Sequence, residues 1–206
     1  MHRTAAALLV SLAFWLTAQA QETPKVEVFA GYSVTRVSFP IASDPAAGSA
    51  RATLQGWNAS AAFNVNRWVG VLIDESQYYG HPTVSEVFKP ANCVLCTGEV
   101  TATLKNINTF FVGPQFSIRR DKTTVFAHPL IGFSHVQEDL VSSVVPSAFI
   151  FSTTKAYMLG GGVDVALSQH IALRAQPDYL LMQFFGRRHN DFHLSTGVVF
   201  RFGHLQ

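Results

Sequence analysis

The sequence predicts an all-β fold, an eight-stranded antiparallel up-and-down transmembrane β-barrel. Three observations lead to this prediction: an N-terminal export signal with no second long apolar run after it, eight segments in which apolar and polar residues alternate, and connections that are alternately short and long. Lipid offers no hydrogen-bond partners to the backbone, so only helices and closed barrels cross a membrane. A membrane protein whose mature chain has no helical span must therefore be a barrel.

The N-terminus has the three parts of a secretory signal peptide. Positive residues at 2–3 are followed by an apolar run over 5–16, and the Ala-Gln-Ala at 18–20 places small residues at the two positions needed for cleavage. The run is too short to span a bilayer as a helix. We expect a cleaved signal peptide over 1–20 and one exported domain, the barrel, over 21–206.

The composition fits an exterior that faces lipid. Lys and Arg number 15 against 13 Asp and Glu, a near balance that argues against a nucleic-acid partner. Charged residues make up only 14% of the chain, and 17 residues are Phe. A soluble domain of this size normally carries more surface charge.

Eight segments show the period of two that is typical of strands. In the third, for example, Val69, Val71 and Ile73 alternate with Gly70 and Asp74. Each segment reaches the roughly 9–11 residues that a tilted strand needs to cross the bilayer. The segments are 26–37, 54–65, 68–79, 104–118, 123–136, 156–167, 171–184 and 192–202.

The connections between these segments alternate in length. Short polar turns are expected at 64–67, 119–122 and 167–170. The other connections are longer, at 38–53, 80–103, 137–155 and 186–191. Outer-membrane barrels have short periplasmic turns and longer extracellular loops. Within the strands, Pro114 and Pro129 predict a bulge or another local irregularity, because proline donates no hydrogen bond to the sheet.

The polar face of each segment should line a lumen that side chains just fill at eight strands. Its predicted residues are Glu27, Asn58, Asp74, Gln115, His128, Asp164, Arg174, Gln176, Asp178 and Arg201. Charges held away from water must be paired. We therefore expect Arg174 and Arg201 to bridge to one or more of the four acids, Glu27, Asp74, Asp164 or Asp178, and to plug the lumen, with a narrow porin as the alternative.

Aromatic residues near the predicted strand ends should form the girdles seen at membrane interfaces. They are Trp57, Trp68, Tyr78, Tyr79, Phe110, Phe184 and Phe202. Alternation places Glu75 on the lipid face, which is tolerable near the outer headgroups. The Gly-rich 160–162 fits close backbone approach rather than a phosphate loop.

Cys93 and Cys96 lie in the longest predicted loop as a Cys-x-x-Cys pair. In an oxidising envelope this spacing predicts a small disulfide that pins the loop. A redox dithiol would need a βαβ setting, and a zinc site would need two further ligands.

Five motifs carry a resemblance to a known family. They are Val28–Ser33, Phe111–Ser117, Gly161–Val165, Arg174–Leu180 and Ser195–Phe202. In this order they resemble the small outer-membrane barrels of Gram-negative bacteria, of the OmpA transmembrane-domain and porin-family type. The resemblance implies the outer membrane of the cell envelope, with its lipid and lipopolysaccharide, as the location. It also implies delivery by the barrel-assembly machinery, with Ser195, Gly197, Phe200 and Phe202 as the assembly signal. The tail at 203–206 departs from many relatives, which end on the aromatic residue.

The family does not fix one activity, because function lies in sites placed on a fold. We expect a non-enzymatic scaffold without cofactor or metal, whose loops, above all 80–103, meet an unknown extracellular ligand. His193-Leu194-Ser195 has the His-x-Ser spacing of outer-membrane lipid A deacylases, which keeps a lipid-modifying enzyme as an alternative. Both residues should face the lumen, however, and no acid follows them. A soluble lipocalin-like barrel would need apolar inward faces, which the polar faces here argue against.

Overall fold

The computed structural model describes residues 23–40, 49–88, 98–142, 148–184 and 187–205, which form strands and the turns between them. Among these residues, no helix is long and apolar enough to cross a membrane. The predicted signal peptide over 1–20 lies outside the described residues. The strands are β1 (Pro24–Pro40), β2 (Ser49–Asn64), β3 (Val69–Tyr79), β4 (Thr83–Phe88), β5 (Gly98–Arg120), β6 (Thr123–Ser142), β7 (Ala148–Ala166), β8 (Ile171–Phe184) and β9 (Arg187–His204).

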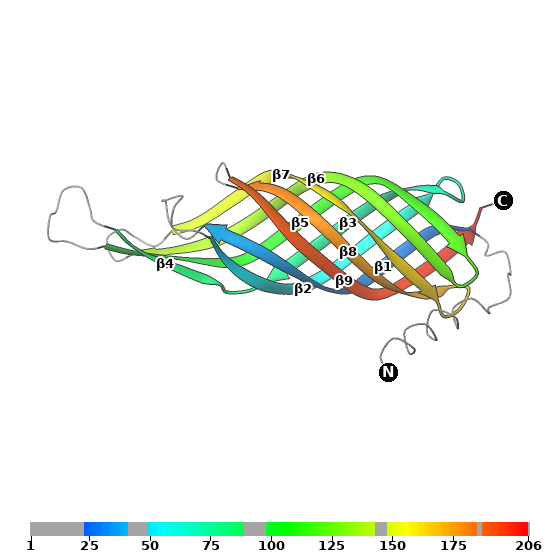
Figure 1. The fold of residues 1–206 in the computed structure, drawn as a ribbon, viewed down its shortest axis with the longest axis horizontal. Coiled ribbons are helices and arrows are strands. Elements are labelled where there is room, and N and C mark those ends of the chain that lie inside the picture. Colours follow the sequence, from blue (N-terminus) through cyan, green and yellow to red (C-terminus); the bar gives the residue numbers. More distant parts are fainter. Residues whose placement is uncertain (1–22, 41–48, 89–97, 143–147, 185–186, 206) are drawn as a thin grey trace, which may run out of the picture.

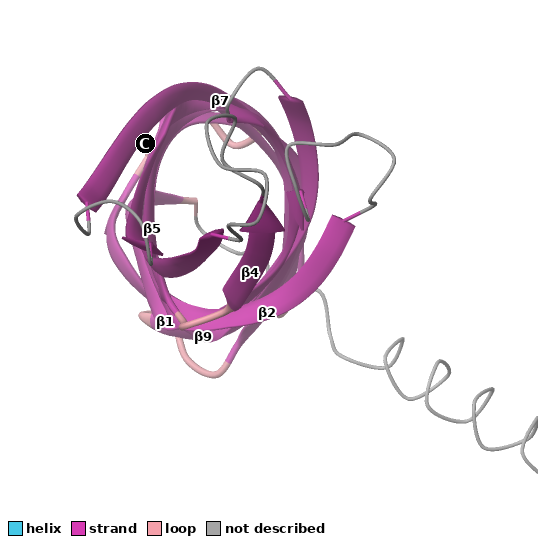
Figure 2. Cartoon of the chain, turned by 90° about the vertical axis from the view of Figure 1, so that its left-hand side faces the viewer, coloured by secondary structure: helices cyan, strands magenta, loops and turns pink. Residues whose placement is uncertain are grey.

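The strands close into a barrel, as Figures 1 and 2 show, and the strand pairings place eight of them in the ring. Every neighbouring pair is antiparallel, β3 pairs with β5, and β9 returns to pair with β1. The closing pair matches Val26 with Phe202 and Arg36 with Phe192. The predicted eight-stranded antiparallel barrel is therefore confirmed, with β4 as a ninth strand that pairs with β5 beyond the ring.

One end of the barrel carries the short turns and the ends of the described chain. Asn66 Oδ1 accepts hydrogen bonds from the backbone N–H groups of Trp68 (2.8 Å) and Val69 (2.9 Å), which closes the β2–β3 turn. Asp121 has a positive φ of 48° in the β5–β6 turn, a conformation that Asp tolerates better than most residues. Pro24 lies opposite His204 at this same end. The tail follows from Gly203, whose φ of 63° turns the chain so that Leu205 N–H donates to Thr23 O at 2.9 Å.

The strands run further at the opposite end than the sequence predicts. The loop expected over 80–103 contains β4 and the start of β5, so its assignment as one loop was wrong. The connections expected at 38–53, 137–155 and 186–191 are also shorter, because β1, β2, β6, β7 and β9 continue into them. β4 and the facing part of β5 are rich in Val and Thr, which favour strands. Figure 1 shows this sheet protruding at the left of the barrel.

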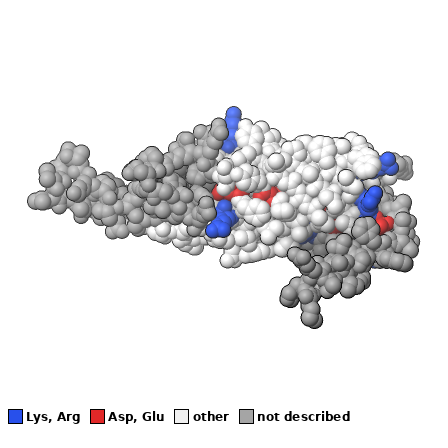
Figure 3. All heavy atoms as spheres, in the orientation of Figure 1, with Lys and Arg blue, Asp and Glu red and all other residues white. Residues whose placement is uncertain are grey.

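The outer wall is an apolar belt. Along β3, Leu72 and Asp74 are fully buried while Ile73, between them, is 37% exposed. The same alternation leaves large apolar side chains exposed on all eight barrel strands. On the face drawn in Figure 3, Lys and Arg side chains lie mainly towards the two ends. This distribution matches a wall that meets lipid, as predicted.

Three prolines interrupt the hydrogen bonding of the wall without shifting its register. Val112 pairs with Ile131 and Phe116 with Ala127, which places Pro114 directly opposite Pro129, yet the three positions between them are unpaired. Neither proline has an N–H to donate, so both bonds of this pair are lost. The predicted irregularity is thus a gap in the ladder, and the register shift of β5 lies elsewhere, between Leu104 and Asn106. Pro177 leaves a similar gap between β7 and β8.

Candidate functional site

The structure places all seven predicted charged and imidazole residues of the lumen inside the barrel. None of them is more than 3% exposed. The predicted lumen residues Asn58, Gln115 and Gln176 are equally buried. The alternation along each strand therefore assigned these residues to the correct face of the barrel. A shift by one residue would instead have turned all polar side chains of a strand towards the lipid.

Five charged residues meet near the turn end of the lumen, and we call them the inner ion-pair cluster: Glu27, Arg119, Asp164, Arg174 and Arg201. Arg174 donates two hydrogen bonds to the Asp164 carboxylate, one from Nε (2.7 Å) and one from a terminal nitrogen (2.9 Å). Arg201 lies between both acids, 3.3 Å from Glu27 and 3.8 Å from Asp164. Arg119 reaches Glu27 from the far side at 3.1 Å. The cluster thus joins β1, β5, β7, β8 and β9 across the bore.

Aromatic rings and amides complete this cluster. The Arg174 guanidinium lies 4.3 Å from the centre of the Phe126 ring and 5.3 Å from that of Phe29. Asn64 donates to Glu27 at 3.3 Å. Cations over aromatic faces and paired in a desolvated site interact strongly. Arg119 was not among the predicted lumen residues, although it shares the parity of Gln115 and Ser117 on β5.

A second group, the mid-lumen cluster, consists of Asn58, Asp74, His128, Asp178 and His193. Asp178 is held by both imidazoles, 2.9 Å from His128 Nε2 and 3.3 Å from His193 Nδ1. Asp74 instead accepts from Asn58 Nδ2, at 3.0 Å to each carboxylate oxygen. Of the four acids predicted as alternative partners of Arg174 and Arg201, the described ion pairs go to Glu27 and Asp164 and not to these two aspartates.

Two neighbours shape the mid-lumen cluster. The Tyr78 ring meets the His193 ring edge to face, with the centroids 5.5 Å apart. Tyr78 is only 1% exposed, so its assignment to the interfacial girdle was wrong. Gly160 lies opposite Asp178, and a Cβ at this glycine would collide with the carboxylate. The Gly-rich segment therefore makes room for the Asp178 side chain.

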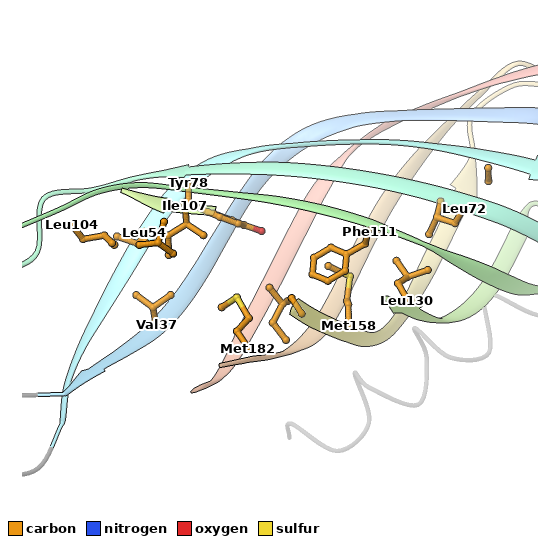
Figure 4. Close-up of a cluster of buried hydrophobic side chains, with 14 residues drawn as sticks. Val37, Leu54, Leu72, Tyr78, Leu104, Ile107, Phe111, Leu130, Met158 and Met182 are labelled. Carbon is orange, nitrogen blue, oxygen red and sulfur yellow. The ribbon is translucent and has the colours of Figure 1, made fainter. Parts of the chain in front are cut away.

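The lumen is not polar along its whole length, contrary to the prediction. Apolar side chains fill part of it, as Figure 4 shows for Val37, Leu54, Ile107, Phe111 and Met158. Val37 and Leu54 lie close to the loop-side ends of their strands. Ion pairs thus lie across the lumen at the turn end, and apolar side chains pack inside it towards the loops.

The His193-Ser195 pair lies inside the lumen, and both side chains are fully buried. Among the described residues, Ser195 Oγ has no hydrogen-bond partner, and neither does His193 Nε2. A serine nucleophile needs a base within hydrogen-bond reach. No hydrogen bond joins Ser195 Oγ to His193 in the described structure, and both side chains face away from the lipid.

The remaining predicted residues are the cysteine pair, the assembly signal, the aromatic girdle and Glu75. Cys93 and Cys96 lie outside the described residues. Ser195, Gly197, Phe200 and Phe202 lie on β9, where Gly197 faces Gly31 of β1 and the two phenylalanines are exposed. Of the expected girdle, the exposed members are Trp57, Trp68, Tyr79, Phe110 and Phe202. Glu75 is exposed on the outer wall, two positions from Gln77, whose side chain accepts from Trp57 Nε1 at 3.2 Å.

Comparison with known proteins gives a family and a set of similar folds. The family model for the outer membrane protein beta-barrel domain matches residues 5–202. A search of curated proteins found no match. Among solved structures, Neisserial surface protein A has a TM-score of 0.59 at 15% identity, over 90% of this chain and 99% of its own. Ail, the attachment invasion locus protein of Yersinia pestis, has a TM-score of 0.53 at 19% identity, over 86% and 99%.

Proposed function

Because the chain belongs to the outer membrane protein beta-barrel domain family, we propose that it is a non-enzymatic anchor in the bacterial outer membrane that displays its loop-side strands to an extracellular ligand. The side chains that fill the bore support this role, the display of a binding surface, over the passage of solutes through the lumen. Five charged side chains from five strands interlock at one end, and apolar side chains pack towards the other. Eight strands leave an interior that side chains can fill.

The protruding sheet is the surface proposed for binding. β4 has β5 on one side and ends the strand order of the sheet, which continues through β6 and β7. β5 and β6 stay paired as far as Val100 and Ser142, well beyond the barrel pairing of β3 with β5. The fold thus presents a platform built from paired strands at the loop end.

A sulfated glycan is the first ligand class to test. Ail of Yersinia pestis has been solved in complex with sucrose octasulfate, a heparin analogue. We propose to measure heparin binding by the full chain in liposomes, and by a variant in which 81–102 is replaced by a short turn. Binding that is lost in this variant, but kept when only 143–147 is shortened, supports the platform. Equal binding by both variants would place the ligand elsewhere.

Planar-bilayer recording tests the closed lumen against the narrow-porin alternative. The closed lumen predicts no steady single-channel current from the wild-type protein. Arg201→Gly together with Arg119→Gly should still give no steady current, because the apolar side chains that pack towards the loops remain. Large steady currents from the wild type would refute the proposal.

The non-enzymatic assignment is supported by the geometry of His193 and Ser195. Their burial keeps them from lipid, and no hydrogen bond joins them in the described structure. Incubation with lipid A, followed by analysis of released acyl chains, tests this assignment. Acyl release by the wild type that Ser195→Ala abolishes would overturn it.

The C-terminal strand supports the proposed route of assembly. β9 closes the ring against β1, with Phe200 and Phe202 on the lipid face. The last strand of the sequence, which pairs with the first to close the ring, is a suitable recognition site for the barrel-assembly machinery. We infer that lipid and lipopolysaccharide then surround the apolar belt.

A further inference from the structure

The mid-lumen cluster contains a carboxylate without a positive partner. Asp74 is fully buried. Of the described residues, no Lys, Arg or His nitrogen lies within 4.0 Å of its oxygens, whereas Asp178, Glu27 and Asp164 all have such partners. An ionised carboxylate in a dry interior is costly unless it is paired. Asp74 must therefore either carry a proton or have a positive charge beside it.

The neighbours of Asp74 do not supply that charge. On the wall, Ser60 faces it from β2 and Phe111 from β5. Across the bore, Asp178 and the two imidazoles act on it only electrostatically. His128 and His193 both hold Asp178. The arginines of the inner ion-pair cluster hold Glu27 and Asp164.

Two residues of β2 next to Asp74 each carry a buried oxygen atom without a hydrogen-bond partner in the described structure. Ser60 Oγ, opposite Asp74, and Asn58 Oδ1 have no hydrogen-bond partner among the described residues. Both side chains are more than nine-tenths buried. Native proteins leave few buried polar atoms unsatisfied, and each one points to a water or an ion. On β2, Ser60 pairs directly with Asp74, and Asn58 reaches the Asp74 carboxylate with its side-chain amide.

We propose that the lumen binds one small monovalent metal cation, such as Na⁺ or K⁺, at Asp74, with oxygen ligands from Asp74, Ser60 and Asn58. Carboxylate, amide and hydroxyl oxygens are the ligands that hard cations prefer. A single carboxylate matches a single positive charge, while Mg²⁺ and Ca²⁺ sites use more carboxylates. A proton on Asp74 would remove the charge but leave the Ser60 and Asn58 oxygens unsatisfied.

Side chains pack across the bore at the turn end and towards the loops, so the cation should enter as the barrel folds. The test refolds the full protein from urea into micelles in chloride salts of Na⁺, K⁺ or bulky N-methyl-D-glucamine, at equal pH and ionic strength. A cation that binds only the folded state raises the folding equilibrium constant roughly tenfold when its concentration is ten times its Kd. We expect a higher urea midpoint in Na⁺ or K⁺ than in N-methyl-D-glucamine.

Matched variants distinguish a specific site from a general salt effect. Asp74→Asn should abolish the difference between the salts, whereas Asp121→Asn, in an exposed turn, should keep it. Ser60→Ala retains the charge and should reduce the difference, which preserves the test if Asp74→Asn does not fold. Retention of about one ⁸⁶Rb⁺ per barrel after gel filtration, lost in Asp74→Asn, would support the site directly. Equal midpoints in all salts, or a difference that survives in Asp74→Asn, would overturn the proposal and favour a proton on Asp74.

Discussion

Removing the charge of Glu27 should be the most damaging single change in the barrel interior. Its two carboxylate oxygens hold different arginines, Arg201 at 3.3 Å and Arg119 at 3.1 Å, and the side chain is 1% exposed. Glu27→Gln keeps the shape but leaves three arginines facing Asp164 alone. Breaking a buried pair by removing one partner costs about 3–5 kcal/mol, because the other charge stays buried without compensation. We expect the free energy of unfolding to fall by that amount.

The chain offers a matched control at its surface. Lys105 and Asp139 pair at 3.1 Å, but their side chains are 39% and 21% exposed. Solvent screens such a pair, so Asp139→Asn should cost less than about 1 kcal/mol. Both substitutions remove one negative charge from one ion-paired acid, and they differ mainly in burial.

Urea titration in lipid vesicles measures both variants through tryptophan emission. Trp57 and Trp68 are 38% and 47% exposed on the outer wall, so they pass from lipid to water on unfolding. A Glu27→Gln variant that loses no more stability than Asp139→Asn would refute the reasoning. The double variant Glu27→Gln/Arg201→Gln should lose less than the sum of the single losses, because the two residues share one interaction.

Three further substitutions probe the wall, the bore and assembly. Pro129→Val restores an N–H opposite Pro114 and should raise the free energy of unfolding by about 0.5–1.5 kcal/mol; Ala127→Val, an outward position on the same strand, controls for added volume, and equal gains in both would contradict the account. Gly160→Ala should destabilise by about 1–3 kcal/mol through collision with Asp178. Gly70→Ala meets Asn64 Oδ1 only at 2.9 Å and should cost less in the same titration. Phe202→Ala should lower the amount of heat-modifiable, folded barrel in the outer membrane, while Phe63→Ala, equally exposed to lipid on β2, should not; equal losses would argue against a C-terminal assembly signal.

The face of each residue could be predicted from the sequence because it depends only on parity along a strand. Glu27 and Arg201 follow this rule, and so does Tyr78, which shares the parity of Asp74 and Ser76. The error at Tyr78 came from giving its aromatic character more weight than its position. The same rule would have placed Arg119 and Leu54 inside the bore, so the apolar part of the lumen could also have been predicted from the sequence.

The partners inside the bore could not be predicted, because they depend on how the strands are staggered around the ring. Glu27 and Arg119 are 92 positions apart and meet only after the barrel closes. The opposition of Pro114 and Pro129 likewise needs the register of β5 against β6. The loop-side ends of the strands could not be predicted, because strand pairing continues there beyond the length that is needed to cross a bilayer.

The separation of the two polar clusters explains why the charges of the lumen do not simply cancel. Three arginines face two acids in the inner ion-pair cluster, and two acids face two imidazoles in the mid-lumen cluster. A surplus positive charge at the turn end could compensate Asp74 only over a distance at which no contact forms. Desolvation is offset by direct contacts rather than by net charge, so the arginine surplus does not relieve Asp74. Asp74 must therefore be neutralised where it lies, by a proton or by the proposed cation, and the unpartnered oxygens of Ser60 and Asn58 favour the cation.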